Sequence, residues 1–329
     1  MLAVAFALAA SLCWGSGDFL GGLTTRRATL WAVVVGSQAV GLAGAALVVV
    51  LAGRPWIGFA GLWPVLLGGL AGSIALMAFY KALAIGTMSI VAPITATSAL
   101  IPLLWGLAQG ERPSGLQFAG IALAVGGVLL ATTAGSTRDE TVGTGALPGE
   151  PAIALPDTGP RLAPPGSAAA SPAESKPRAA ETGLPVGAAD RARQRRAVVL
   201  ALVAAVGIGL MLLGYDGTAR YDPLWAMLGG RISSACFFTV ILLALRPRIG
   251  MTRAALPGIV AVGVLDTSAN GLFALATTQG LLSLVAVVGS LYPVVTVVLA
   301  YLVLRERLAR HQLVGVVAAL AGVALIAGR

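Results

Sequence analysis

Long apolar segments recur along both ends of the chain and are separated by short polar turns. Each segment can cross the roughly 30 Å hydrocarbon core of a bilayer, which takes about 20 helical residues. Lipid offers backbone groups no hydrogen-bond partners, so segments of this length are expected to be helical. The pattern predicts ten transmembrane helices, at residues 2–22, 30–52, 61–84, 87–109, 114–134, 197–217, 223–245, 255–279, 282–304 and 311–328.

The middle of the chain, residues 136–196, lacks this pattern. Its 61 residues include 9 of the 18 prolines and no Phe, Trp or Tyr, together with 8 basic and 7 acidic residues. Such a segment cannot bury enough apolar surface to fold alone. We therefore predict a disordered linker between two membrane-embedded halves, residues 1–135 and 197–329, with a regulatory tail as the alternative.

The two halves also repeat each other in sequence. The matches at offsets of 194 and 195 residues include Phe79 with Phe273, Gly86 with Gly280, and Glu111-Arg112 with Glu306-Arg307. Each repeat has five helices, and an odd number makes the second copy enter the membrane from the opposite face. The sequence therefore predicts an all-α integral membrane protein made of two inverted five-helix repeats, with a binding site between them near the midplane.

Residues 82–130 and 284–326 share a further arrangement. Each contains a Pro-bearing fourth helix, an acidic-basic pair at its end, and a Gly-rich fifth helix. In these features the chain resembles the EamA-type transporters of the drug/metabolite transporter superfamily, and the resemblance covers everything but the long linker. Arg231 lies where that family often has Arg, whereas the first repeat has Ser37 there. The resemblance implies secondary transport, often export, of small metabolites or drugs.

Composition narrows the class of protein. The chain is 57% hydrophobic and only 11% charged, with a mean hydropathy of +0.91, whereas soluble proteins are roughly 25% charged. With two cysteines and one histidine, we expect no metal site, no cofactor and no hydrolytic triad. The net charge of +9 fits membrane loops as well as nucleic acid, and we expect no nucleic-acid partner. The expected partners are a small-molecule substrate and the lipid bilayer. Whether the chain forms a homodimer is left open.

Polar residues at membrane depth are the candidates for chemistry. A charge at the bilayer centre costs about 2.5–3.5 kcal/mol and needs a partner, a water-filled cavity or a function. Asp266 and Arg231 lie at similar depth on antiparallel helices, and Asn270 follows Asp266 by one turn. Two readings of the Asp266–Arg231 pair stay open. It is either a static ion pair between helices or a substrate or proton site.

Asp18 is the other strong candidate, because its side chain is too short to reach the interface. Lys81 could pair with it or extend to the membrane surface, and Gln38 and Tyr80 are weaker candidates for the same pathway. At helix ends we expect interfacial ion pairs from Glu111 with Arg112 and from Glu306 with Arg307. Five tryptophans, Trp14 among them, lie near predicted span ends and fit an aromatic belt.

Together these features favour a secondary active transporter, coupled to protons or another ion through Asp18 or Asp266, rather than an enzyme. The alternative is a membrane-embedded enzyme or flippase that acts on lipid-linked substrates; a channel would need a ring of like charge, and none is apparent. The chain has no G-x-x-x-x-G-K-[ST] loop for ATP. Its Ala, Gly and Arg bias is typical of a GC-rich bacterial genome, so we expect a bacterial inner membrane.

The distribution of basic residues predicts an orientation. Fourteen Lys and Arg residues lie near the helix ends on the face that carries the linker, against four on the face that carries both termini. The positive-inside rule then places the linker in the cytoplasm. The family resemblance implies the reverse, with both termini inside.

Overall fold

The computed structural model describes residues 1–86, 88–132, 188–305 and 309–328, and all of its regular elements there are helical. In the first repeat the helices are α1 (Leu2–Thr24), α2 (Leu30–Leu51), α3 (Gly58–Ile85), α4 (Met88–Ala96), η1 (Thr97–Ala99), α5 (Leu100–Ala108) and α6 (Gly115–Thr132). In the second they are α7 (Ala188–Ala219), α8 (Pro223–Leu245), η2 (Arg253–Ala255), α9 (Leu256–Thr277), α10 (Leu282–Gly289), α11 (Tyr292–Leu304) and α12 (Arg310–Ala327). Ten spans in the described ranges are long and apolar enough to cross a membrane, which confirms the predicted number.

The fourth and ninth spans are not continuous helices. In the fourth, η1 separates α4 from α5 between Pro93 and Pro102; in the ninth, α10 ends at Gly289 and α11 begins at Tyr292, just before Pro293. Proline has no N–H to donate and its ring displaces the preceding turn. The breaks therefore fall where the sequence placed helix-breaking residues.

The start of the second repeat differs from the prediction. Helix α7 begins at Ala188, inside the segment predicted as linker, so residues 188–196 are helical instead of disordered. Arg193 on this extension donates from Nε to the carbonyl oxygen of Ile85 at the end of α3, 2.9 Å away. The extension is thus held against α3. The rest of the predicted linker, residues 136–187, lies outside the described residues.

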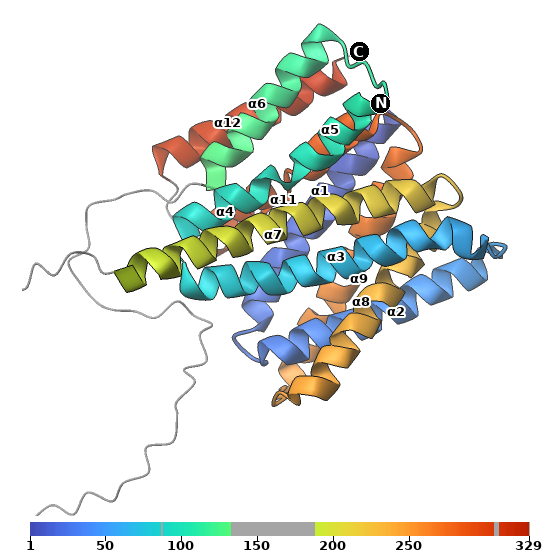
Figure 1. Ribbon diagram of the computed structural model, residues 1–329, viewed down its shortest axis with the longest axis vertical. Coiled ribbons are helices and arrows are strands. Elements are labelled where there is room, and N and C mark those ends of the chain that lie inside the picture. Colours follow the sequence, from blue (N-terminus) through green and yellow to red (C-terminus); the bar gives the residue numbers. More distant parts are fainter. Residues whose placement is uncertain (87, 133–187, 306–308, 329) are drawn as a thin grey trace, which may run out of the picture.

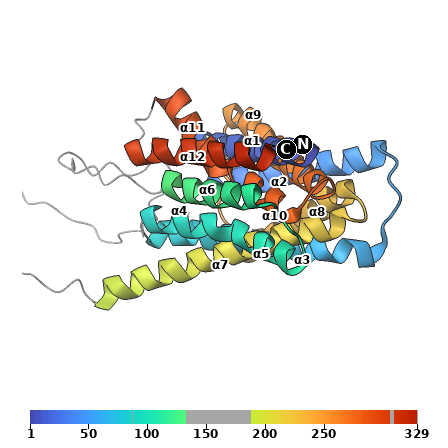
Figure 2. The same ribbon diagram turned by 90° about the horizontal axis from the view of Figure 1, so that it is seen from above.

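The two repeats interlock. Helix α1 packs on α9 and on both parts of the ninth span, α10 and α11, and its counterpart α7 packs on α3 and on both parts of the fourth span, α4 and α5. Helices α2 and α8 contact each other, as do α6 and α12, which form a separate pair at one edge of the molecule (Figure 1). Seen from above, α3 and α7 lie on one side of the molecule, and α1, α9 and α12 lie toward the other (Figure 2). This pattern of contacts is the one expected for two inverted repeats related by a pseudo-twofold axis.

Small residues let the paired helices approach closely. A Cβ built on Gly68 of α3 would lie 2.9 Å from the Cα of Gly214 on α7, and one on Gly120 of α6 would lie 2.7 Å from the carbonyl oxygen of Gly322 on α12. Side chains larger than hydrogen do not fit at such contacts. Helices in lipid associate through close van der Waals contacts of this kind, because the hydrophobic effect gives little driving force for helix association there.

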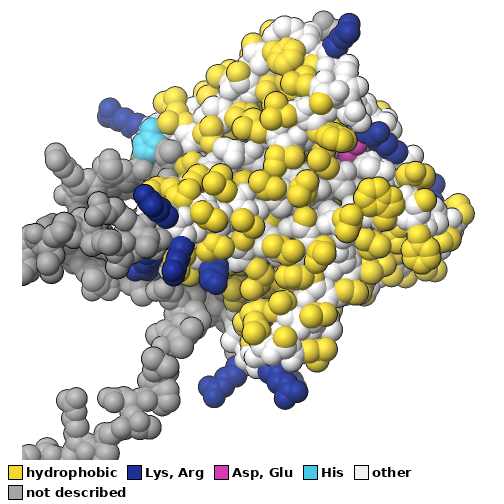
Figure 3. Space-filling model, viewed as in Figure 1, with side chains coloured by type: hydrophobic (Ala, Val, Ile, Leu, Met, Phe, Trp, Pro, Cys, Tyr) yellow, Lys and Arg dark blue, Asp and Glu magenta, His cyan; other side chains and the backbone are white. Residues whose placement is uncertain are grey.

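The surface is consistent with a membrane environment. In the space-filling view hydrophobic side chains cover the flank of the helices, and Lys and Arg gather at its margins, most of them on the side of the molecule from which α7 begins (Figure 3). We call this side the linker end; it holds the ends of α1, α3 and α8 and the starts of α2, α7 and α9. The opposite side, with both termini, is the termini end.

Candidate functional site

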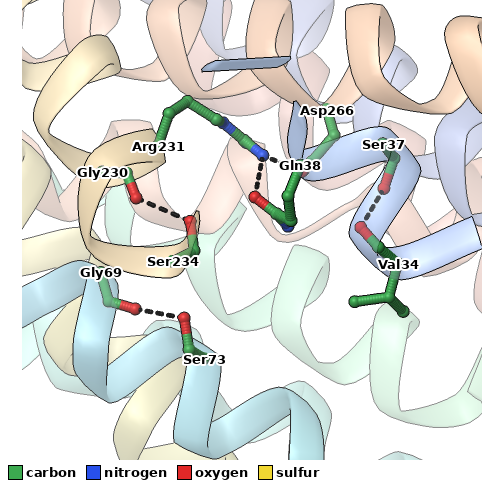
Figure 4. Close-up of polar contacts among 9 residues, drawn as sticks. All are labelled: Val34, Ser37, Gln38, Gly69, Ser73, Gly230, Arg231, Ser234 and Asp266. Carbon is green, nitrogen blue, oxygen red and sulfur yellow. Dashed lines mark hydrogen bonds and ion pairs between the residues drawn. The ribbon is translucent and has the colours of Figure 1, made fainter. Parts of the chain in front are cut away.

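The predicted pair of buried charges is present and includes a third residue. Nη1 of Arg231 on α8 donates to Oδ2 of Asp266 on α9, 2.6 Å away, and to Oε1 of Gln38 on α2, 3.2 Å away (Figure 4). The arginine is 3% exposed, and 37% of the Asp266 side chain is exposed. The guanidinium of Arg231 therefore joins three helices from both repeats. Its ion pair with Asp266 compensates the positive charge at membrane depth.

Hydroxyl groups around this pair bond mainly to their own helices. Ser37, Ser73 and Ser234 donate to carbonyl oxygens three or four residues earlier, at 2.7–3.0 Å (Figure 4). Ser37 is the counterpart of Arg231 in the first repeat, so this position is charged in one repeat and neutral in the other. The charged part of the site is consequently asymmetric, although the helices that carry it are related by pseudosymmetry.

Asp18 on α1 faces the same region from the other side. A Cβ built on Gly17 would lie 4.0 Å from the backbone nitrogen of Asp266, so the two carboxylates are at nearly the same depth. Asp18 is exposed, and it interacts electrostatically with Asp266 of α9, Tyr80 of α3 and Tyr292 of α11. A side chain that is exposed and yet lies within electrostatic range of three other helices borders a space inside the bundle.

Among the acidic residues that the structure describes inside the bundle, Asp18 differs in having no partner. Among the described residues, Asp216, Asp222 and Asp266 each form an ion pair with an arginine, whereas Asp18 forms no ion pair or hydrogen bond. Lys81, which could have paired with Asp18, is exposed near the linker end of α3 and forms no ion pair with a described residue. Its position fits an extended side chain that reaches the membrane surface.

Exposure changes along the depth of the site. Tyr80 is 37% exposed and lies five residues from the linker end of α3, while Asp18 lies six residues from the linker end of α1. Asn270, four residues deeper on α9 than Asp266, is only 4% exposed. Exposure of these site residues therefore falls from the linker end toward the termini end.

Aromatic residues close the site on the termini side. The ring of Trp14 lies 5.7 Å from that of Phe273 on α9 and 6.3 Å from that of Tyr292 on α11. Trp14 is therefore directed into the bundle, and its predicted place in an aromatic belt is wrong. Every residue of α10 beyond this cluster is buried. Tyr292 was not predicted as a site residue, although its place beside Pro293 in mid-span could have signalled it.

The predicted ion pair between Glu111 and Arg112 is not formed. Instead, the Glu111 carboxylate accepts hydrogen bonds from the backbone N–H groups of Leu282 and Ser283, at 2.7 and 2.9 Å, and so caps the start of α10. The first N–H groups of a helix have no partner within it, and a buried start needs an acceptor from elsewhere. An exposed pair with Arg112 would contribute little by comparison. Glu306 and Arg307 lie outside the described residues.

Several buried polar atoms near the site have no partner. They are Oγ of Ser11, Nε of Arg231, Oγ1 of Thr267 and Oδ1 of Asn270. Buried polar groups are nearly always hydrogen-bonded, so such a group usually marks a place that water or a ligand occupies. No group of His, Cys, Asp or Glu residues able to hold a metal ion occurs within the described ranges.

Comparison with known proteins identifies the family. The model of the EamA-like transporter family matches residues 1–133 and 195–328, that is, both repeats. The chain belongs to the EamA-like transporter family. The resemblance seen in the sequence is thus confirmed, and this EamA-like chain is a membrane transporter of the drug/metabolite type.

Solved structures agree on the fold of this EamA-like protein. One of them, described only as the crystal structure of a protein, superposes with a TM-score of 0.69 at 15% identity and covers 98% of this chain and 95% of its own. At that identity the match shows the fold alone. No curated protein matches the sequence.

Proposed function

We propose that this protein is a secondary active transporter that exports a small metabolite or drug by alternating access. The proposal rests on the unpaired, exposed carboxylate of Asp18, which faces the Arg231–Asp266 pair across the interface between the repeats. An uncompensated charge at this depth is costly unless it binds something during the transport cycle.

The described conformation fits one stage of such a cycle. Asp18 and Tyr80 are exposed toward the linker end, whereas Trp14 packs on Phe273 and α10 is buried toward the termini end. In inverted repeats the second conformation follows when the two halves exchange arrangements. We therefore propose that the counterpart of α10, helix α4, closes the linker end in the opposite state.

Asp18 is the proposed coupling residue, in preference to Asp266. Asp266 already has a charged partner in Arg231 at 2.6 Å, whereas Asp18 has none and can take up a proton or cation. The charged and titratable groups that face Asp18 are Asp266, Tyr80 and Tyr292.

We further propose that the linker end faces the cytoplasm of a bacterium, because most basic residues near the helix ends lie there. A substrate would then enter from the cytoplasm, consistent with export. A reporter that is active only in the cytoplasm should give a signal when inserted at position 167 in the linker and none when fused after residue 329. The reverse pattern would support the orientation that the family implies.

Transport is tested with the full chain reconstituted in proteoliposomes. Amino acids, nucleosides and toxic cations are offered with and without an imposed pH gradient. Accumulation against a concentration gradient that disappears in Asp18→Asn supports a coupled transporter. Downhill flux alone would indicate a channel. Turnover of a lipid-linked substrate without any gradient would indicate the enzyme or flippase alternative.

A further inference from the structure

The charge balance of the site points to the substrate class. Arg231 is compensated by Asp266 and Gln38, while Asp18 has no counter-charge. Lys81 is exposed near the linker end of α3 and forms no ion pair with a described residue. Asp18 is therefore the carboxyl group between the repeats that has no counter-charge among the described residues, and a carboxylate there attracts cations and repels anions.

The surroundings of Asp18 also suit an organic cation. Trp14 lies one helical turn from Asp18 on the same face of α1, and the hydroxyls of Tyr80 and Tyr292 are within electrostatic range of the carboxylate. Aromatic faces attract positively charged groups, most strongly where water is partly excluded. An inorganic cation would gain little from these rings, whereas an organic ammonium with an apolar body would pack against them.

A second polar position lies deeper in the site. Oδ1 of Asn270 has no partner and the residue is 4% exposed; Oγ of Ser11, on the helix that packs against α9, is also unpartnered at 1% exposure. Asn270 is one turn, or about 6 Å, further from the linker end than Asp266. An acceptor buried without a partner favours a ligand that brings a hydrogen-bond donor to it.

We propose that the substrates are protonated aralkylamines that bind with the ammonium group at Asp18, the aromatic body against Trp14 and Tyr292, and a hydrogen-bond donor at the far end toward Asn270. This inference rests on the proposed transport function and names its substrate class.

Four related compounds, each with one benzene ring and a short chain, separate the contributions. Tyramine carries the ammonium and the hydroxyl, phenethylamine only the ammonium, 4-ethylphenol only the hydroxyl, and 3-(4-hydroxyphenyl)propionate a negative charge. Binding of each to the purified full-length protein in lipid nanodiscs is measured by calorimetry at pH 7. Tyramine should bind most tightly, with phenethylamine next. The neutral phenol and the anion should bind at least about tenfold more weakly than tyramine, as expected for loss of the charge interaction.

Variants assign the two positions. Asp18→Asn should lower the affinity for both amines at least about tenfold. Asp18→Glu should largely restore that affinity, because it restores the carboxylate. Asn270→Ala should abolish the preference for tyramine over phenethylamine. The control is Asp216→Asn, which removes a carboxylate that already pairs with Arg220 and should leave amine binding unchanged.

Two results would overturn the inference. One is equal binding of 4-ethylphenol, the propionate and tyramine by the wild-type protein, a comparison that needs no variant to fold. The other is wild-type affinity for amines in a folded Asp18→Asn protein. Accumulation of neutral or anionic compounds in proteoliposomes without amine binding would refute the amine class and leave the transport function standing. Amine binding without any transport would refute transport and support the amine class.

Discussion

Replacing Glu111 with alanine should loosen α10, the helix that closes the termini end. The Glu111 carboxylate accepts hydrogen bonds from the backbone N–H groups of Leu282 and Ser283, which are 2% and 0% exposed. In Glu111→Ala both donors lose their acceptor in a buried position. The variant therefore disfavours the closed arrangement without changing the charges between the repeats at Asp18, Arg231 and Asp266.

The size of the effect follows from the two bonds. A hydrogen bond to a charged group contributes about 1.5–3 kcal/mol, and a negative charge at a helix N-terminus adds about 0.3–1 kcal/mol. Water reaches the start of α10 when it opens and offsets part of this sum. We expect a net loss of about 3–4 kcal/mol, which raises the opening equilibrium of α10 about 100- to 1000-fold.

Hydrogen exchange measured by mass spectrometry in nanodiscs reports this opening directly. Protection of the peptide that covers α10 should fall by about 100- to 1000-fold in Glu111→Ala. The peptides of α6 and α12, which pair with each other at one edge of the molecule, should keep their protection. That internal reference separates local opening of α10 from general loss of stability.

Two further variants decide between the cap and the ion pair expected from sequence. Arg112→Ala should leave α10 protected, because Arg112 is exposed and forms no ion pair with Glu111. Gly106→Ala should act like Glu111→Ala, since a Cβ on Gly106 would overlap the Glu111 carboxylate. Unchanged protection of α10 in Glu111→Ala, or an equal loss in Arg112→Ala, would refute the role of the cap.

Three other outcomes are expected. Asp266→Leu should lower the free energy of unfolding by about 3 kcal/mol in denaturant titrations, because it leaves Arg231 buried without a counter-charge, and combining it with Arg231→Leu should recover part of the loss. Gly127→Ala should reduce thermal stability because its Cβ would overlap α12, whereas Gly126→Ala, with open space around it, should not. Asp222→Ala should cost about 1 kcal/mol in the same titrations, because its carboxylate caps the start of α8.

Part of the site could be predicted from single residues. The charges of Asp266 and Arg231 cost free energy at membrane depth, and their positions on antiparallel spans put them at a similar depth. The amino-acid sequence alone was therefore enough to predict the pair. Gln38 was only a weak candidate, because a neutral amide in a span has no comparable cost. Its bond to Arg231, 193 residues away, depends on how α2 and α8 cross.

Other features depend on contacts that sequence spacing does not encode. Glu111 stands beside Arg112 in the chain, but its carboxylate bonds to α10, 171 residues away, because packing of α5 on α10 brings a buried helix start within reach. Trp14 is placed like an interfacial residue in the sequence, but α9 and α11 supply Phe273 and Tyr292 as its neighbours.

The sequence by itself determined the number of spans, the inverted repeat and the family, because lipid requires long apolar helices and two five-helix copies must enter from opposite faces. Only the tertiary structure decided that Asp18 has no partner among the described residues and that exposure falls from Tyr80 to Asn270. Both depend on how the helices of the two halves pack around these side chains. Hydrophobicity determines that a helix lies in the membrane. Contacts among polar and aromatic side chains determine which face of that helix is exposed to water.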